Sequence, residues 1–258
     1  MKSSSVLQQE SAKSLVLQSI QKRLLSRTVS RPSNWVKTYR LIESIHDKKV
    51  IEPWSFKYHP WSKEMLDCKD PHWCSQKGAQ LSISEVLINL SLFSIDQLSL
   101  SVLYGLPSER PDARDFCLTR FNTVLKLSPY IRSMFNEHQA MSPKMAGTRA
   151  LYIRGSRGGA TFDSIPVGLV CLDEVDKMSE TAVSLARERM SGHTNMYLRE
   201  ASTPSIPGRG VNKTFEKSTQ DFFAFKCPHC SRLTHLIFPD CLIIKPMILK
   251  IQTSRIVT

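Results

Sequence analysis

Residues 165–178 combine a short apolar run with two acidic residues directly after it. Residues 166–172 are all apolar or glycine and rich in β-branched side chains, which is typical of a strand buried on both faces of a parallel sheet. Asp173 and Glu174 follow at the carboxyl end of this predicted strand, where open α/β sheets bind their ligands. The pattern predicts an α/β fold with a functional sheet edge at this point.

An apolar strand that ends in Asp-Glu is the Walker B arrangement of nucleotide hydrolases. Asp173 would hold Mg²⁺, and Glu174 would polarise the water that attacks the γ-phosphate. The alternative is a core strand whose acids only begin a loop or favour the N-terminus of the next helix. The choice depends on whether a phosphate-binding loop lies upstream.

A polar loop that contains Gly78 runs upstream into a helical pattern. The pattern opens at Ser84-Glu85, and its apolar positions are Val86, Leu87, Leu90 and Phe93. A loop before a helix N-terminus offers free N–H groups to phosphate. Ser84 is placed to ligate Mg²⁺, and Lys77 can reach the β- and γ-phosphates. Lys77 precedes the single glycine, so the loop departs from GxxxxGK[ST] and is weak evidence alone.

Further alternation predicts strands at residues 98–107, 150–153 and from 196 onward, with a glycine-rich connection at 154–164. Helices are expected at 110–129 and 179–190, the latter with Ser179 as N-cap. The expected buried positions are Ala113, Phe116, Phe121 and Leu125 in the first helix, and Ala182, Val183, Ala186 and Met190 in the second. The last strand breaks at Ser202-Thr203, which is either an ordinary turn or the γ-phosphate sensor found in helicase-like motors.

Three tryptophans, Trp35, Trp54 and Trp61, stand among prolines before this region. Such aromatics either anchor a core, which we favour, or stack on adenine. Residues 1–30 are rich in Ser, Gln, Lys and Arg, and we expect a mobile or partly helical leader there rather than a dedicated DNA-binding arm.

The charge of the chain favours polyanionic partners, nucleic acid first. Lys and Arg total 35 against 23 Asp and Glu, a formal charge of +12, and +7 of this lies in residues 1–50. Seven dispersed cysteines argue for a reducing compartment, and no apolar run is long enough to span a membrane. An N-terminal signal peptide is not evident, so an intracellular protein is expected.

Cys227 and Cys230 form half of a zinc site at the predicted tip of a hairpin. Four ligands are usual, and the remaining ones would have to come from His229, His235 or Cys241. The fit is poor. The tail 239–258 has no clear period and no assigned role.

In their order along the chain, six blocks resemble the large terminase subunits of tailed bacteriophages, in the branch typified by phage lambda. They are SNWVKTYRLI with YHPWSKEMLD, QKGAQLSISE, PSERPDARDFCLTRF, LVCLDEVDKM, STPSIPG and FKCPHC. The resemblance runs from about Ser33 to Phe238 and places the early lysine, Lys77, in a deviant Walker A loop.

The resemblance implies a P-loop NTPase-like parallel sheet with helices on both faces (residues 31–225), followed by an incomplete zinc-ribbon-like segment and tail (226–258). It implies a Mg²⁺-dependent ATPase that drives viral DNA into a capsid in the host cytoplasm. The implied partners are duplex DNA, the small terminase subunit and the portal. Whether several copies of the chain form a homo-oligomer stays open. The residues implied to contact ATP are Trp61, Lys77, Gly78, Ala79, Gln80, Ser82 and Ser84. Asp173 and Ser84 would bind Mg²⁺, and Glu174 would be the catalytic carboxylate. Ser202 and Thr203 would form the coupling turn, and Cys227 and Cys230 would bind Zn²⁺.

The chain also departs from this family. Ser82 stands where the family's phosphate loop has glycine, and Asp240 is the only acid between Ser231 and Thr258, so no nuclease centre is expected. A truncated or degraded prophage copy is therefore expected. An arginine finger is required by analogy, with Arg154, Arg157, Arg187 and Arg189 unranked. Two alternatives stay open: a helicase-like ATPase, and a non-catalytic DNA-binding remnant.

Overall fold

The structure, a computed structural model, describes residues 31–44, 46–136, 143–157, 162, 165–192 and 196–235. The chain divides into two compact units, Met1–Thr219 and Gln220–Thr258. The predicted leader, much of the predicted glycine-rich connection, and the tail from residue 236 with Cys241 lie outside the described residues.

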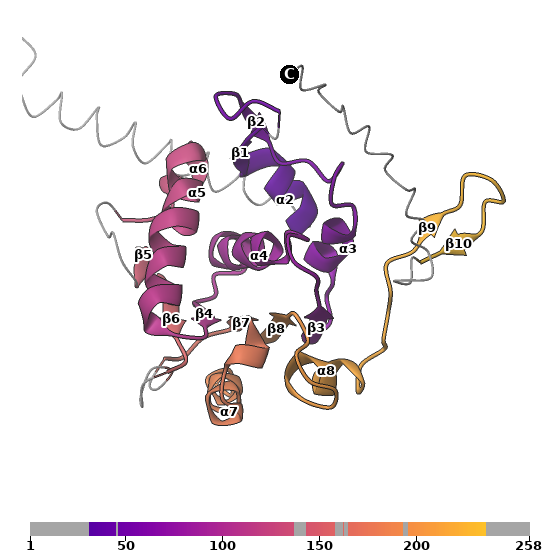
Figure 1. Cartoon of the computed structure of the whole chain (residues 1–258). Coiled ribbons are helices and arrows are strands. Elements are labelled where there is room, and N and C mark those ends of the chain that lie inside the picture. Colours follow the sequence, from indigo (N-terminus) through magenta and orange to yellow (C-terminus); the bar gives the residue numbers. More distant parts are fainter. Residues whose placement is uncertain are drawn as a thin grey trace, which may run out of the picture. The chain divides into compact units, whose positions relative to one another are not determined.

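A six-stranded sheet organises the first unit (Figure 1). Its strands, in spatial order, are β3 (His72–Gln76), β8 (Tyr197–Ser202), β7 (Leu169–Asp173), β4 (Val102–Leu106), β6 (Arg149–Gly155) and β5 (Lys144–Ala146). All neighbouring pairs are parallel except β5 with β6. The carboxyl ends of β3, β8 and β7 therefore lie side by side at one edge of the sheet.

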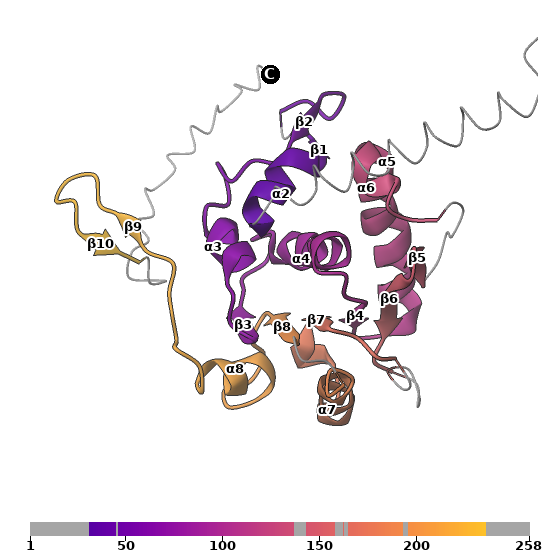
Figure 2. The ribbon, with the colours of Figure 1, turned by 180° about the vertical axis from the view of Figure 1, so that it is seen from behind.

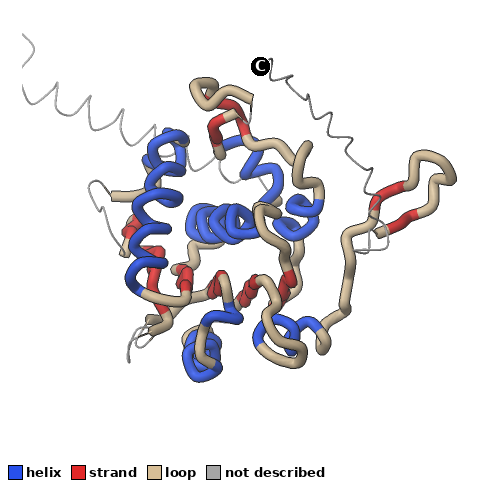
Figure 3. Tube along the Cα trace, in the orientation of Figure 1, coloured by secondary structure: helices blue, strands red, loops and turns tan. Residues whose placement is uncertain are grey.

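Helices cover both faces of this sheet, as the turned view and the tube also show (Figures 2 and 3). On one face lies α4 (Ile83–Gln97), with α2 (Pro32–Tyr39) and α3 (Trp61–Asp67) packed over it. On the other face lie α7 (Glu180–Glu188) and α8 (Gly210–Phe215). None of the helices in the described part of the chain is long and apolar enough to cross a membrane.

Shorter elements complete the unit. They are β1 (Leu41–Glu43), β2 (Ile51–Pro53), η1 (Glu109–Ala113), η2 (Phe116–Phe121), α5 (Asn122–Leu127), α6 (Pro129–Arg132) and η3 (Val175–Lys177). The β1–β2 pair is an antiparallel hairpin. In the second unit, β9 (Phe225–Lys226) and β10 (Leu233–Thr234) form another short hairpin.

Two hydrophobic cores lie on opposite faces of the sheet. The larger joins α4 to α2, α5 and the inner strands, with Trp35, Leu87, Phe121 and Ile131 among its buried side chains. The smaller joins α7 to β7, with Val183 and Ala186 against Val170 and Leu172. Alternate residues of β7 pack into different cores, because successive side chains of a strand point to opposite faces: Cys171 lies in the larger core and Val170 in the smaller one. This explains why β7 is apolar throughout.

Several sequence predictions are confirmed at the level of elements. Strand β7 is buried at all five positions and ends at Asp173. Ser179 caps α7, and its side chain accepts a hydrogen bond from the backbone N–H of Ala182. The four predicted inward positions of that helix, Ala182, Val183, Ala186 and Met190, are buried. Mixed α/β architecture with helices on both faces is therefore the observed fold.

Two details of the prediction are wrong. Residues 110–129 do not form one regular helix, because η1 and η2 make wider π-type turns before α5 begins. Arg110 has an extended backbone (φ −132°, ψ 128°), which is what a following proline favours. Strand β3 was not predicted, because its residues, HWCSQ, are mostly polar and only partly buried at the edge of the sheet.

Candidate functional site

The candidate site lies where β3, β8 and β7 end. Lys77 follows β3 directly, and its backbone N–H donates to the carbonyl of Ser202 at 3.0 Å. Glu174 follows β7, and its backbone N–H donates to the carbonyl of Ala201 at 2.8 Å. The carboxyl end of β8 therefore binds, through backbone hydrogen bonds, both Lys77 after β3 and Glu174 after β7. Segments nearly a hundred residues apart in the sequence meet at one sheet edge, as parallel strand order requires.

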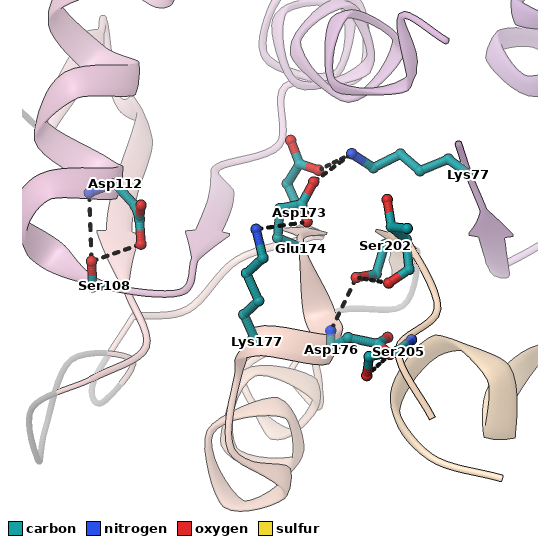
Figure 4. A network of polar contacts seen from close by, with 10 residues as sticks. Lys77, Ser108, Asp112, Asp173, Glu174, Asp176, Lys177, Ser202 and Ser205 are labelled. Atoms are coloured by element: carbon teal, nitrogen blue, oxygen red, sulfur yellow. Dashed lines mark hydrogen bonds and ion pairs between the residues drawn. The ribbon is translucent and has the colours of Figure 1, made fainter. Parts of the chain in front are cut away.

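The side chain of Lys77 points at the two carboxylates that follow the apolar strand (Figure 4). Its Nζ lies 2.6 Å from Oε1 of Glu174 and 3.5 Å from Oδ1 of Asp173. Lys177, on η3, approaches the other oxygen of Glu174 at 3.3 Å. The structure therefore joins the predicted phosphate-binding lysine to the predicted Walker B pair, and adds Lys177, which the sequence did not single out.

The ionisation of this pair follows from its surroundings. Burial alone would lower the pKa of Lys77, but Asp173 and Glu174 raise it above its usual value. Burial alone would raise the pKa of Glu174, but Lys77 and Lys177 lower it below its usual value. Both groups are therefore charged at neutral pH. A charged lysine suits phosphate binding, and an ionised glutamate suits the acceptance of a proton from water.

Asp173 is held in place by a tyrosine from the neighbouring strand. The hydroxyl of Tyr104, on β4, donates to Oδ2 of Asp173 at 3.0 Å, and both side chains are buried. Burial first, and the Asp173 charge second, raise the pKa of Tyr104 well above its usual value, so the phenol keeps the proton that it donates. Nothing in the sequence of residues 98–107 distinguished Tyr104 from a core residue.

The second oxygen of Asp173 fits a metal ligand. Oδ1 is buried and accepts no hydrogen bond, although Lys77 lies 3.5 Å away. A buried carboxylate oxygen without a donor is unusual, and hard oxygen ligands suit Mg²⁺. Ser84, the other predicted Mg²⁺ ligand, lies in the first turn of α4, and its carbonyl oxygen is 3.5 Å from the Tyr104 hydroxyl. Tyr104 therefore lies between the two predicted ligands.

The loop between β3 and α4 has an unusual backbone. Gln80 and Ser82 both have positive φ, 60° and 58°, in the left-handed region that costs non-glycine residues on the order of 1–3 kcal/mol. Ser82 is the N-cap of α4, yet its side chain makes no capping hydrogen bond. Gly78 has room for a Cβ, which would make only an ordinary contact with Leu81. The positions in this loop that favour glycine are thus Gln80 and Ser82, rather than Gly78.

One tryptophan supports this loop from outside. The indole N–H of Trp61 donates to the carbonyl of Leu81 at 3.1 Å. Trp35 and Trp54 are instead buried in the larger core, so the core interpretation is confirmed for these two. Trp61 is only partly buried and contacts the loop that precedes α4.

The predicted coupling turn contacts the Walker B segment through a third acid, Asp176. The backbone N–H of Asp176 donates to Ser202 Oγ at 3.2 Å. The Asp176 carboxylate accepts from the Ser205 N–H and hydroxyl, both at 2.8 Å, and from the Val211 N–H at 2.8 Å. Thr203 is exposed. Asp176 was not singled out by the sequence, although it follows Asp173 by three residues.

Comparison with known proteins agrees with this geometry. The family model "Phage terminase large subunit gpA, ATPase domain" matches residues 49–255, most of the chain. The chain belongs to this family. The match spans the predicted phosphate loop, Asp173 and Glu174, and the predicted coupling turn, and the terminase resemblance is confirmed at family level.

A solved structure of the HK97 bacteriophage large terminase shares the terminase fold. It superposes with a TM-score of 0.60 at 11% sequence identity, over 72% of this chain and 40% of that one. The present chain thus corresponds to less than half of the length of that terminase. No curated protein matches the chain.

Two of the four arginines that the sequence proposed as fingers, Arg187 and Arg154, have contacts within this terminase domain. Arg187 donates to the buried Glu200 at 2.8 Å. Arg154 lies over the ring of Tyr152 with its guanidinium carbon 5.8 Å from the centroid. Which arginine, if any, serves a neighbouring terminase subunit stays a prediction.

The zinc prediction gains no support from the part of the chain described. Cys227 and Cys230 lie in the β9–β10 hairpin, where the Cys227 N–H donates to the Arg232 carbonyl at 2.8 Å. Hydrogen bonds from the backbone of Cys230 and His229 lower the pKa of the Cys227 thiol. Across residues 31–235, leaving aside the undescribed gaps, no three His, Cys, Asp or Glu side chains come together as a metal site.

Proposed function

We propose that this chain hydrolyses ATP at the sheet edge formed by Lys77, Asp173 and Glu174, and that it is the motor domain of a terminase large subunit. The observation that carries the proposal is the position of Lys77 Nζ, within 3.5 Å of both carboxylates. A lysine from the loop after one strand meets an Asp-Glu pair after another strand, which is the charge arrangement that phosphoryl transfer needs.

The residues divide the chemistry between them. Lys77 and the N–H groups of residues 78–84 bind the phosphates, with the α4 N-terminus behind them. Asp173 and Ser84 are the residues that would hold Mg²⁺, which neutralises charge on the phosphate oxygens when bound. Tyr104 bonds Oδ2 of Asp173 and so fixes the rotamer of that side chain, which leaves Oδ1 facing Lys77 Nζ at 3.5 Å. Trp61 keeps the phosphate loop in place through Leu81.

Glu174 is the group that accepts a proton from water. In the structure its carboxylate is bonded to Lys77. Phosphate oxygens compete for the same lysine Nζ, so substrate binding releases one oxygen of Glu174 to orient water. Lys177, which also lowers the pKa of Glu174, remains at the other oxygen of that carboxylate and favours its ionised form. Ser202 and Thr203, on the strand between the two charged partners, would sense the γ-phosphate.

The wider role follows from family membership. Hydrolysis would drive duplex DNA into a capsid in the host cytoplasm, with the small terminase subunit and the portal as partners. The order of the sequence blocks supports the lambda-like branch. Zinc at Cys227 and Cys230 would require ligands from outside the described hairpin.

A charge-removing substitution tests the site. Lys77→Met should weaken ATP binding at least roughly ten-fold, because a charge-assisted contact to phosphate contributes about 1.5–3 kcal/mol. Lys126→Met, on the exposed side of α5, is the matched control and should bind ATP as the wild type does. Isothermal titration with Mg²⁺ and ATP measures both. Equal affinity of wild type and Lys77→Met would refute the site.

A further inference from the structure

Asp176 connects three segments that lie far apart in the sequence. It lies on the short η3 turn, two residues after Glu174. Its backbone N–H donates to Ser202 Oγ, and its Oδ2 accepts from the N–H and the hydroxyl of Ser205 (Figure 4). Its Oδ1 accepts from the N–H of Val211. We call Asp176 with Ser202, Ser205 and Val211 the Asp176 clasp.

The Asp176 clasp requires a carboxylate at position 176, because an amide of the same shape cannot accept all of its hydrogen bonds. Both of its oxygens accept hydrogen bonds, and all of its side-chain partners are donors. An asparagine has the same shape but only one acceptor oxygen, so its NH₂ would face a donor. Burial alone would raise the pKa of Asp176, but the hydrogen bonds from Val211 and Ser205 lower it, which keeps the acceptor ionised.

The backbone of α8 is shaped to receive this carboxylate. Gly210, the first residue of α8, has φ +53°, and a Cβ at this position would overlap Asp176 Oδ1. Helix α8 packs against β3, the strand that leads into Lys77. The loop before α8 lines an open cavity of about 270 Å³ together with Gln76, the residue directly before Lys77. The Asp176 clasp therefore connects the turn after Glu174, through α8, to β3, the strand that precedes Lys77.

We propose that Asp176 is the positioning residue that transmits the state of the γ-phosphate site to the segment 203–215. Glu174 and Asp176 share one short turn, so a movement of Glu174 away from Lys77 turns Asp176 as well. Because the Asp176 carboxylate is bonded to Ser205 and Val211, the loop before α8 and the start of α8 then move together with Asp176. Helix α8 is the last helix before the second unit begins at Gln220, which places the clasp on the path from ATP to the rest of the chain. This inference rests on the proposed ATP site.

Hydrogen exchange measured by mass spectrometry tests the proposal on the full chain, with and without Mg²⁺ and ATPγS. Peptides from residues 77–87 report nucleotide binding, and peptides from 203–215 report the clasp. In the wild type both should change on nucleotide addition. In Asp176→Asn the first should still change and the second should not. Turnover should fall roughly two- to thirty-fold at saturating ATP, the range that coupling mutations produce, with ATPγS affinity within about two-fold.

Matched variants separate the clasp from general damage. Glu180→Gln removes one exposed negative charge four residues away and should respond as the wild type does. Gly210→Ala should uncouple the segment as Asp176→Asn does, and it replaces that variant if Asp176→Asn fails to fold. Gly208→Ala imposes the same positive-φ strain (φ +72°) with no atom near its Cβ, and should keep the response.

The outcomes are distinguishable. A response of residues 203–215 that survives in both Asp176→Asn and Gly210→Ala overturns the clasp and leaves the ATP site standing. A wild type that responds at 77–87 but not at 203–215 overturns the clasp as well. A wild type that responds in neither region overturns the proposed function, and the clasp with it.

Discussion

At the scale of single residues, the phosphate loop stores strain at Ser82. Its φ of 58° is one that glycine adopts freely and serine does not. If the free loop relaxes from this backbone and nucleotide holds the bound loop in it, part of about 1–3 kcal/mol of strain falls on the bound conformation alone. Ser82→Gly removes that part and should tighten ATP binding by up to roughly ten-fold.

A matched control exists for this prediction. Ser99 also has positive φ, 54°, but lies in the turn after α4, away from the loop. Ser99→Gly should relieve comparable strain, raise the free energy of unfolding and leave ATP affinity unchanged. Titration of the three proteins with Mg²⁺ and ATP decides between strain and a direct contact of the serine hydroxyl. Weaker binding by Ser82→Gly would indicate a direct contact of the hydroxyl with phosphate, and unchanged binding would equally refute the strain interpretation.

The residue scale also shows where sequence reasoning ended. Asp173 and Glu174 were singled out because they follow an apolar run, and Lys77 because it stands in a polar, glycine-containing loop before a helical pattern. Ser202 was singled out because a strand pattern breaks there. Tyr104 was not, because a tyrosine in an apolar strand looks like core until its partner is known. The same holds for Asp176, whose donors come from residues 202–211. Such contacts depend on tertiary pairing, which local pattern does not contain.

At the scale of elements, three segments are joined by one buried carboxylate. Glu200, on β8, is 1% exposed and contacts His72 of β3 at 2.9 Å and Arg187 of α7 at 2.8 Å. Burial alone would raise the pKa of Glu200, but hydrogen bonding to His72 and the Arg187 charge lower it below its usual 4.5. The ionised form therefore stabilises the packing of α7 and β3 on β8.

A pH dependence of stability follows from the sign of this shift. A depressed carboxylate pKa contributes stability that is fully present above the unfolded value of 4.5 and is lost as pH falls through the lower folded value. Glu200→Gln should lower the free energy of unfolding by roughly 1–3 kcal/mol at pH 7 and flatten its decline below pH 4.5. Urea unfolding at several pH values measures this.

Glu64→Gln provides the comparison for that series. Glu64 lies exposed in the first turn of α3, where its charge is solvated. Its removal should leave both the neutral-pH stability and the acid decline close to wild type. An acid decline in Glu200→Gln as steep as that of the wild type would show that other groups control acid unfolding.

The elements were predicted in proportion to how well they are buried. Strand β7 and helices α4 and α7 carry clear apolar periods and were found. Strand β3 was missed because it is an edge strand with a polar sequence, held by backbone pairing to β8. The π-type turns of η1 and η2 were missed because the apolar spacing of residues 113–125 fits a helix and gives no information on which carbonyl each N–H chooses.

At the scale of the whole molecule, the excess of positive charge favours a polyanionic partner, nucleic acid first. Of the +12 charge, residues 1–30 supply five cations against one acid. Replacing these five Lys and Arg with Gln should reduce the slope of log affinity for duplex DNA against log salt, by about 0.9 for each phosphate that these side chains neutralise. Fluorescence anisotropy over a salt series measures the slope. An unchanged slope would mean that residues 1–30 do not bind phosphates.

The central claim is that Glu174 activates water for ATP hydrolysis, and turnover of Glu174→Gln tests it most directly. The amide cannot take a proton, so Mg²⁺-dependent ATP turnover should fall at least about 100-fold, the lower range for a lost general base. ATP binding should persist, because Lys77 is then freed from its carboxylate partner. Glu180→Gln should turn over as the wild type does. Equal turnover in wild type and Glu174→Gln would contradict the assignment of the site.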